Sequence, residues 1–166
     1  TPRSSSAASD VYKRQAIHTA KKHANKENID INYILGEAEN LLPEQNEHYD
    51  VVTCLEAIEH VPDPNQLVKT CSDLCKKNGD IFFSTINRNP KSFLFAIVGA
   101  EYILNLLPKG THDYEKFIKP SELIQMMENN GLTIKELTGM SYNPLTKNYW
   151  LGKNVDVNYL IHAKKI

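Results

Sequence analysis

Two short apolar runs on either side of a helical pattern constrain this fold most. Residues 49–54 (YDVVTC) and 81–86 (IFFSTI) are apolar or β-branched almost throughout, and each has the length of a strand. Between them, residues 62–77 predict a helix with Asp63 at its N-cap and Pro64 at its first helical position. Apolar strands joined by a helix are typical of parallel sheets buried on both faces. We therefore expect an α/β fold.

The remaining patterns extend this alternation of helices and strands. Residues 16–25 predict a helix, and residues 31–35 (INYIL) predict a strand. Residues 120–129 predict another helix, and residues 132–140 and 155–166 predict the last two strands. The loop between these two strands is too short to hold a crossover helix, so we expect them to be antiparallel neighbours.

The composition fits one globular domain and excludes several classes of protein. The 166 residues carry 19 Lys and Arg against 20 Asp and Glu, and 41% of the residues are hydrophobic, which is the balance of a chain with an ordinary core. The near-zero net charge argues against nucleic acid as the main partner. Three cysteines, an odd number, argue against a disulfide scaffold, and we expect all three to be buried thiols.

The first fifteen residues differ from the rest of the chain. Residues 1–15 are rich in Ser and Ala, lack apolar periodicity and contain no stretch that resembles a secretory signal. We expect a foreign or disordered segment there, and the domain itself in residues 16–166.

The segment that follows the first apolar run carries the strongest candidates for chemistry. Glu56, Glu59 and His60 are spaced i, i+3 and i+4, so one helical turn would present two carboxylates and an imidazole on one face. Such a trio can hold a divalent cation, with the oxygens favouring magnesium or manganese and the imidazole favouring zinc or a transition metal. Alternatively, His60 acts alone as a general base, or the segment is a solvated helix start.

A weaker candidate follows the predicted strand at residues 31–35. Gly36, Glu37 and Ala38 could contact a nucleotide-like cofactor through backbone groups and the Glu37 carboxylate. A simple turn that begins at Gly36 explains the same residues, so the two interpretations stay open.

The longest apolar run extends from Phe93 to Leu107 and is interrupted by Glu101 and Asn105. It falls short of the roughly 20 residues that a membrane-spanning helix needs. Lysine and arginine residues flank it on both sides. The run predicts either an element at a membrane surface that also meets an apolar substrate, or a buried helix or lid.

Seven longer motifs together resemble the ubiquinone-biosynthesis O-methyltransferases. They are YDVVTCLEAIEHVPDP, NRNPKS, GAEY, LLPKGTHDY, KFIKPSEL, NPLT and DVNY, and the resemblance extends over nearly all of residues 16–166. It implies a class I S-adenosylmethionine-dependent methyltransferase fold, Rossmann-like, with a seven-stranded sheet that ends in an antiparallel hairpin. It also implies O-methylation of polyprenylated catechol and hydroquinol intermediates.

The resemblance further implies roles for single residues. Leu55 is similar to a position that contacts S-adenosylmethionine, and Glu56, Glu59 and His60 match the positions assigned to a magnesium ion. A cation held there would lower the pKa of the catechol oxygens before one of them attacks the methyl group.

The same resemblance implies where such a protein works. We expect it at a membrane surface, on the cytoplasmic face of the inner membrane in a bacterium or on the matrix face of the inner mitochondrial membrane. A ubiquinone-biosynthesis complex is a candidate partner, beside the polyprenylated substrate.

One part of the family pattern is absent from this sequence. The glycine-rich loop and the acidic strand end that the family carries should precede residue 16, and neither is present. We therefore expect an amino-terminally shortened copy whose sheet lacks its first two strands and which is inactive by itself. Two alternatives remain: a related methyltransferase of another small phenol or quinone, and a non-enzymatic lipid-binding module.

Overall fold

The computed structural model describes residues 4–93, 114–143 and 146–166. The chain divides into two compact units, Thr1–Asn40 and Leu41–Ile166. The first unit consists of helix α1 (Ser4–Lys26) and an irregular segment that leads to the short 3₁₀ helix η1 (Ala38–Leu41). The helix predicted at residues 16–25 is confirmed inside α1. Because α1 begins at Ser4, residues 4–15 are helical here, and their foreign origin stays a prediction.

The strand predicted at residues 31–35 is wrong. This segment has no regular secondary structure, and the side chains of Ile31, Ile34 and Leu35 are about half exposed. A strand needs a neighbour that takes up its backbone hydrogen bonds, and no described strand pairs with these residues. The segment has the β-propensity of a strand, but no described strand pairs with it.

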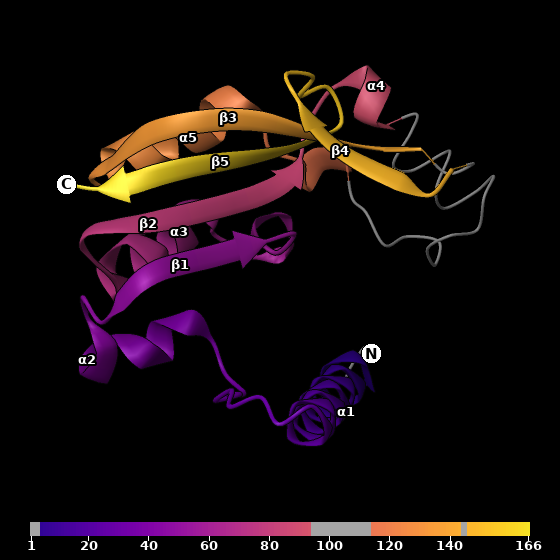
Figure 1. The fold of residues 1–166 in the computed structure, drawn as a ribbon, viewed down its shortest axis with the longest axis vertical. Helices are drawn as coiled ribbons and strands as arrows, with labels where there is room; N and C mark the ends of the chain where they lie inside the picture. The colour runs from indigo at the N-terminus through magenta and orange to yellow at the C-terminus, as the bar shows by residue number, and fades with distance from the viewer. Residues whose placement is uncertain (1–3, 94–113, 144–145) are drawn as a thin grey trace. The chain divides into compact units, whose positions relative to one another are not determined.

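The second unit is built around a five-stranded sheet with the order β1-β2-β5-β3-β4 (Figure 1). Its first two strands, β1 (Tyr49–Leu55) and β2 (Cys75–Ile86), are parallel, as predicted. β5 (Asn158–Lys165) is antiparallel to both β2 and β3 (Leu132–Asn143). The predicted antiparallel pairing of the last two strands is therefore confirmed, and the α/β fold class with it.

β4 (Asn148–Gly152) is a strand that lies where the sequence predicted only a loop. It pairs antiparallel with the end of β3 and lies at an edge of the sheet. All five of its residues are exposed, so its apolar side chains do not follow the inside–outside alternation by which a half-buried strand is recognised.

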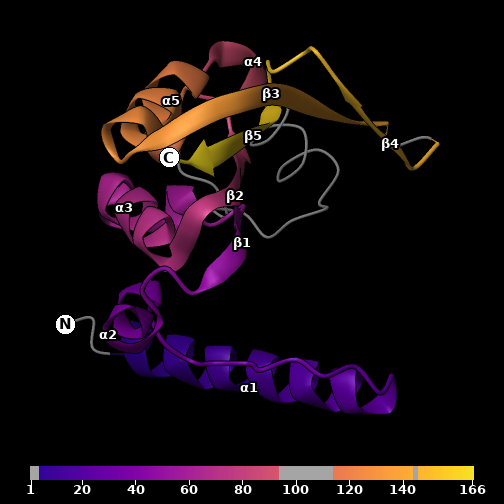
Figure 2. The same ribbon diagram turned by 60° about the vertical axis from the view of Figure 1, so that its left-hand side comes forward.

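Two longer helices cover one face of the sheet, α3 (Pro64–Leu74) and α5 (Pro120–Asn129) (Figure 2). Both begin with proline at the first helical position, where its missing N–H costs nothing. The prediction for α3 was three residues too long at its C-terminus. Cys75 already pairs with Tyr49 in the sheet, so strand pairing ends the helix before Asn78.

Four short helical segments complete the described part of this unit. They are α2 (Leu42–Gln45), the 3₁₀ helix η2 (Ile58–His60), α4 (Pro90–Ser92) and the 3₁₀ helix η4 (Tyr114–Lys116). Of these, η2 and α4 are the next elements after the ends of β1 and β2, which makes them part of the site described below.

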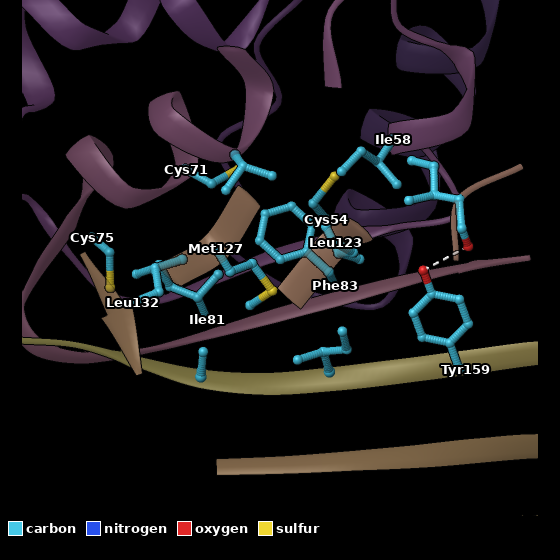
Figure 3. Close-up of a cluster of buried hydrophobic side chains, with 14 residues drawn as sticks. Cys54, Ile58, Cys71, Cys75, Ile81, Phe83, Leu123, Met127, Leu132 and Tyr159 are labelled. Atoms are coloured by element: carbon cyan, nitrogen blue, oxygen red, sulfur yellow. Dashed lines mark hydrogen bonds between the residues drawn. The ribbon is translucent and has the colours of Figure 1, made fainter. Parts of the chain in front are cut away.

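The hydrophobic core lies between the sheet and the helices α3 and α5 (Figure 3). The strands contribute one face of alternating side chains, and each helix contributes one apolar stripe. All three cysteines are free and buried, as predicted. A hydrogen bond with Cys71 lowers the pKa of the Cys54 thiol, against the opposing effect of burial. The larger members of the core are Ile58, Val68, Ile81, Phe83, Leu123, Met127, Tyr159 and Ile161.

The apolar run from Phe93 to Leu107 lies outside the described residues, apart from Phe93 itself. Among the residues that the structure describes, no helix is both long and apolar enough to cross a membrane.

Candidate active site

The candidate site lies where the two parallel strands end. Leu55 closes β1 and is paired with Ser84, two residues before the end of β2. The carboxyl ends of parallel strands meet at one edge of the sheet, which is where open α/β sheets bind their ligands. The segment Glu56–His60 leaves this edge from β1, and the segment that begins at Asn87 leaves it from β2.

Glu56 is held by hydrogen bonds to a single residue of β2. Its backbone N–H donates to both the carbonyl oxygen (3.0 Å) and the hydroxyl oxygen (3.1 Å) of Ser84. The Ser84 hydroxyl in turn donates to Glu56 Oε1 over 2.8 Å. Glu56 has a φ of 50°, in the left-handed region that side chains other than glycine rarely adopt. The three hydrogen bonds stabilise this conformation, so the backbone leaves β1 sharply at Glu56.

Glu59 is a buried carboxylate. It is only 3% exposed, and its Oε2 accepts a hydrogen bond of 2.7 Å from the Thr85 hydroxyl, which is fully buried. Its other oxygen, Oε1, lies 3.9 Å from Nε2 of His60. The His60 side chain itself is about half exposed. The exposed imidazole of His60 thus lies next to the buried carboxylate of Glu59, which is held in place by its hydrogen bond from Thr85.

The single helical turn predicted for Glu56, Glu59 and His60 is wrong. Only Ile58–His60 is helical, as one 3₁₀ turn, and Glu56 precedes it with a left-handed backbone. The reason is the pair of hydrogen bonds from the Glu56 N–H to Ser84, a contact from another strand that local spacing does not reveal.

The same arrangement bears on the magnesium prediction. Within the described parts of the chain, no group of three or more His, Cys, Asp or Glu side chains is arranged to hold a metal ion. Ser84 and Thr85 are successive residues of β2, and successive strand residues point to opposite faces. The carboxylates bound to their hydroxyl groups are therefore held apart, and the predicted donor set does not fit one magnesium ion as it stands.

Sequence reasoning did not single out Ser84 and Thr85. The signal was present as two adjacent hydroxyl residues at the end of the apolar run IFFSTI. Both are nearly or fully buried, and a buried hydroxyl group requires a hydrogen-bond partner. The carboxylates of the neighbouring loop supply one.

The segment after β2 is tied to the loop before β5. The Asn87 N–H donates to the carbonyl of Val157 (2.7 Å), and its side-chain amide donates to the carbonyl of Val155 (2.9 Å). Asn89 donates to the carbonyl of Asp156 (2.6 Å), and Lys91 forms an ion pair with the Asp156 carboxylate (2.6 Å). The motifs NRNPKS and DVNY, about 65 residues apart in sequence, thus form one wall beside the carboxyl ends of the strands.

The motif KFIKPSEL joins the same wall. The N–H of Ile118 donates to the carbonyl of Ile86 (3.2 Å), and its carbonyl accepts the Tyr159 hydroxyl (2.9 Å; Figure 3). Arg88 and Glu122 form an ion pair. Burial raises the pKa of Tyr159 far above its ordinary value, so this hydroxyl stays protonated as a donor.

The residues predicted to contact a cofactor lie in both units. Leu55 is about half exposed at the end of β1 in the second unit. Glu37 and Ala38 belong to the first unit, where Ala38 opens η1. Their common role in a cofactor site stays a prediction.

Comparison with known proteins identifies the class. Residues 6–137 match the family model of a methyltransferase domain. The chain belongs to this family of methyltransferase domains.

Its sequence relatives are more specific. A ubiquinone biosynthesis O-methyltransferase of Acinetobacter baumannii (strain AYE) is 60% identical over 150 residues, which are 90% of this chain and 63% of that protein. One of Saccharophagus degradans is 57% identical over 151 residues, 90% of this chain and 64% of that protein. The resemblance noted in the sequence is thereby confirmed, and the chain spans less than two thirds of the length of these relatives.

Solved structures share the fold. A SAM-dependent methyltransferase of Methanosarcina mazei superposes with a TM-score of 0.62 at 16% identity, over 92% of this chain and 78% of that one. A possible histamine N-methyltransferase of Thermotoga maritima superposes with a TM-score of 0.57 at 24% identity, over 86% and 67%. The fold class is therefore that of the S-adenosylmethionine-dependent methyltransferases.

Proposed function

We propose that the whole protein transfers a methyl group from S-adenosylmethionine to a hydroxyl group of a polyprenylated catechol or demethylubiquinol. The observation that carries this proposal is the 60% identity to a ubiquinone biosynthesis O-methyltransferase over 90% of the chain. The site supports it, because Leu55 and the segment Glu56–His60 lie at the carboxyl ends of the parallel strands, where open α/β sheets bind their ligands.

The residues of the site supply the acid–base part of the reaction. A phenol must lose its proton as its oxygen attacks the methyl group. His60 is exposed and accepts this proton at Nδ1, the ring nitrogen that does not face Glu59. The buried carboxylate of Glu59 lies 3.9 Å from the other ring nitrogen, Nε2, so Nδ1 is the nitrogen that faces away from it.

The cofactor supplies the methyl group when it is bound, as an electrophile on a positively charged sulfur. Leu55, half exposed at the end of β1, offers it an apolar contact, and Glu56 beside it offers a carboxylate. Glu37 and Ala38 are proposed as further contacts. Holding the phenol oxygen and the methyl group in line provides much of the rate.

The proposal does not depend on magnesium. Glu56 and Glu59 are each bound to a hydroxyl group of β2, and within the described residues no group of three or more His, Cys, Asp or Glu side chains is arranged to hold a metal ion. His60 alone accounts for proton removal, which was the second interpretation of these residues.

The substrate tail and the location are proposed from the resemblance to the ubiquinone biosynthesis O-methyltransferases and from the apolar run that begins at Phe93. A polyprenyl tail is insoluble in water, so the protein would meet its substrate at a membrane surface, cytoplasmic in a bacterium or on the matrix side in a mitochondrion. Phe93 to Leu107 is the proposed contact with the membrane, and a ubiquinone-biosynthesis complex the proposed partner.

The test is calorimetric titration of S-adenosylmethionine into this chain and into a version extended upstream with the residues that its relatives carry there. We expect binding by the extended version only, and methyl transfer by that version to a demethylubiquinol with a prenyl tail. Transfer only to tail-free phenols would identify a different substrate class.

Two other outcomes contradict parts of the proposal. Binding by the short chain would contradict our proposal that this chain is inactive by itself. The absence of binding by both forms, with liposome binding that survives replacement of Glu56 and His60, would favour a non-enzymatic lipid-binding module.

A further inference from the structure

We infer that Ser84 and Thr85 are positioning residues that hold Glu56 and Glu59 on opposite faces of the sheet, so that the two carboxylates have separate roles. In this arrangement Glu56 shapes the cofactor side of the site, and Glu59 supports His60. The part of this inference that concerns turnover rests on the proposed function, whereas the part that concerns cation binding does not.

The first observation is the direction of the two hydroxyl groups. Thr85 follows Phe83 on the face that α3 and α5 cover, because Phe83 belongs to the core cluster. Ser84 shares the other face with Phe82, whose ring stacks on His162 at 4.6 Å. A carboxylate bound to Ser84 and one bound to Thr85 therefore lie on different sides of β2.

The second observation is the environment of each carboxylate. Glu56 is exposed, and its Oε1 accepts the Ser84 hydroxyl. Glu59 is 3% exposed and accepts the Thr85 hydroxyl, which is itself fully buried. A buried carboxylate that loses such a donor pays the cost of desolvation without compensation, so Glu59 is not free to turn toward Glu56.

The third observation is the backbone between the two. Glu56 has a left-handed backbone, and the 3₁₀ turn begins only at Ile58. The backbone thus leaves the strand direction at Glu56, before the 3₁₀ turn that carries Glu59. Bringing both onto one cation would require the Glu56 N–H to leave Ser84 or the Glu59 carboxylate to leave Thr85.

The first experiment uses Mn²⁺ as a paramagnetic substitute for magnesium, with binding followed by electron paramagnetic resonance. It compares this chain with the Glu56→Gln and Glu59→Gln variants and needs no activity. We expect that no Mn²⁺ site is lost in both the Glu56→Gln and the Glu59→Gln variant. A single Mn²⁺ site that disappears in each of the two variants would overturn the inference, whereas loss in one variant alone would support it.

The second experiment separates the two hydroxyl groups by kinetics in the extended version. Thr85→Val keeps the shape of the side chain and removes the hydroxyl, and we expect kcat to fall about tenfold or more with the Kd of S-adenosylmethionine unchanged. Ser84→Ala is expected to raise that Kd roughly threefold to tenfold, because the loss of the hydrogen bond to Glu56 costs about as much free energy as one ordinary hydrogen bond contributes. Its effect on kcat should be smaller.

Conservative variants serve as controls. Thr85→Ser and Ser84→Thr each keep a hydroxyl group. Thr85→Ser should therefore retain most of the wild-type kcat, and Ser84→Thr most of the wild-type affinity for S-adenosylmethionine. Circular dichroism of each variant shows whether it folds. If Thr85→Val does not fold, the Thr85→Ser variant and the Mn²⁺ measurement still test the inference.

The same kinetic pattern in Ser84→Ala and Thr85→Val, or a loss of thermal stability alone, would overturn the inference. A wild-type protein without any turnover would contradict the proposed function and leave the Mn²⁺ and Kd results valid.

Discussion

Gly139 lies where the loop before β5 passes over β3. A Cβ atom at this position would lie 1.7 Å from the carbonyl oxygen of Asn154 and 2.4 Å from its carbon. These are backbone atoms, so the loop itself would have to move. The carbonyl groups of Val155 and Asp156 in the same loop accept the hydrogen bonds of Asn87 and Asn89. The glycine at position 139 therefore helps to keep this wall of the candidate site in place.

We expect Gly139→Ala to lower the free energy of unfolding by about 1–3 kcal/mol, the usual cost of overpacking a tightly packed position. Urea denaturation followed by circular dichroism measures the change. Gly152 is the matched control, because it pairs with Gly139 across the hairpin and a Cβ added there would meet no described atom within 4 Å. Equal effects of the two substitutions would contradict the predicted clash.

The sequence alone could locate the candidate residues but not their geometry. Glu56, Glu59 and His60 follow a recognisable strand, so their place at the edge of the sheet follows from the pattern. Their directions depend on Ser84 and Thr85, which are 28 and 26 residues away in sequence. Spacing within one segment contains no information about such contacts.

At the scale of elements, Asp63 shows how one side chain fixes the start of α3. Its carboxylate accepts the N–H of Gln66 at 3.0 Å, and its backbone is extended, as an N-cap requires. α3 carries Val68 and Cys71 into the core. The stability of the whole second unit is therefore coupled to this cap.

Asp63→Ala should reduce the free energy of unfolding by about 1 kcal/mol, the typical cost of losing an N-cap. Thermal unfolding followed by circular dichroism provides the measurement. Asp63→Ser keeps an oxygen acceptor at the same place and should retain most of the stability. A serine variant as unstable as the alanine variant would show that the cap is not the cause.

A second element-scale feature links β2 to β5. Asp80 Oδ1 lies 2.7 Å from Nε2 of His162, and its Oδ2 lies 3.4 Å from Nζ of Lys164. The hydrogen bond with His162 is the main reason why the pKa of Asp80 lies below its ordinary value of 3.8, with burial acting against it and Lys164 adding to it.

This lowered pKa predicts how stability depends on pH. A carboxylate with a lower pKa in the folded state stabilises the fold at pH values above its ordinary pKa, and the contribution is lost as the pH falls through the lowered value. Between about pH 6 and pH 2.5 the Tm of the wild type should therefore fall further than the Tm of Asp80→Asn. His162→Gln should flatten the curve as well, and parallel curves for all three proteins would disprove the linkage.

The elements themselves were largely predictable. Apolar runs with helical or strand periodicity located β1, β2, β3, β5, α3 and α5, because burial on one or both faces leaves a repeating pattern. The segment at residues 31–35 and β4 show the limit of this rule. The first has the composition of a strand without a described partner, and the second has a partner but no buried face.

At the scale of the whole molecule, stability is concentrated in one unit. Every member of the main core cluster belongs to Leu41–Ile166. The first unit has an irregular stretch between α1 and η1 with exposed apolar side chains. Segments with few buried contacts open at low free-energy cost, and such segments are where proteases cut first.

Limited digestion with a protease specific for glutamate tests this difference. We expect cleavage after Glu27 or Glu37, both exposed in the first unit, before cleavage after Glu59, which is buried beside Thr85. Mass spectrometry of the early fragments identifies the cut. Early cleavage after Glu59 would contradict both the predicted order and the buried carboxylate described for the site.

The position of β5 has a consequence for biosynthesis. Among the described strands this one is made last, yet it lies between β2 and β3 and pairs with both along most of its length. While the ribosome is still elongating the chain, β2 and β3 each lack the neighbour that joins them, and the sheet exists only as two separate halves. Since pairing between distant segments is slow, we expect the nascent protein to expose the edges of β2 and β3 that β5 later covers, and to be most prone to aggregation in this interval.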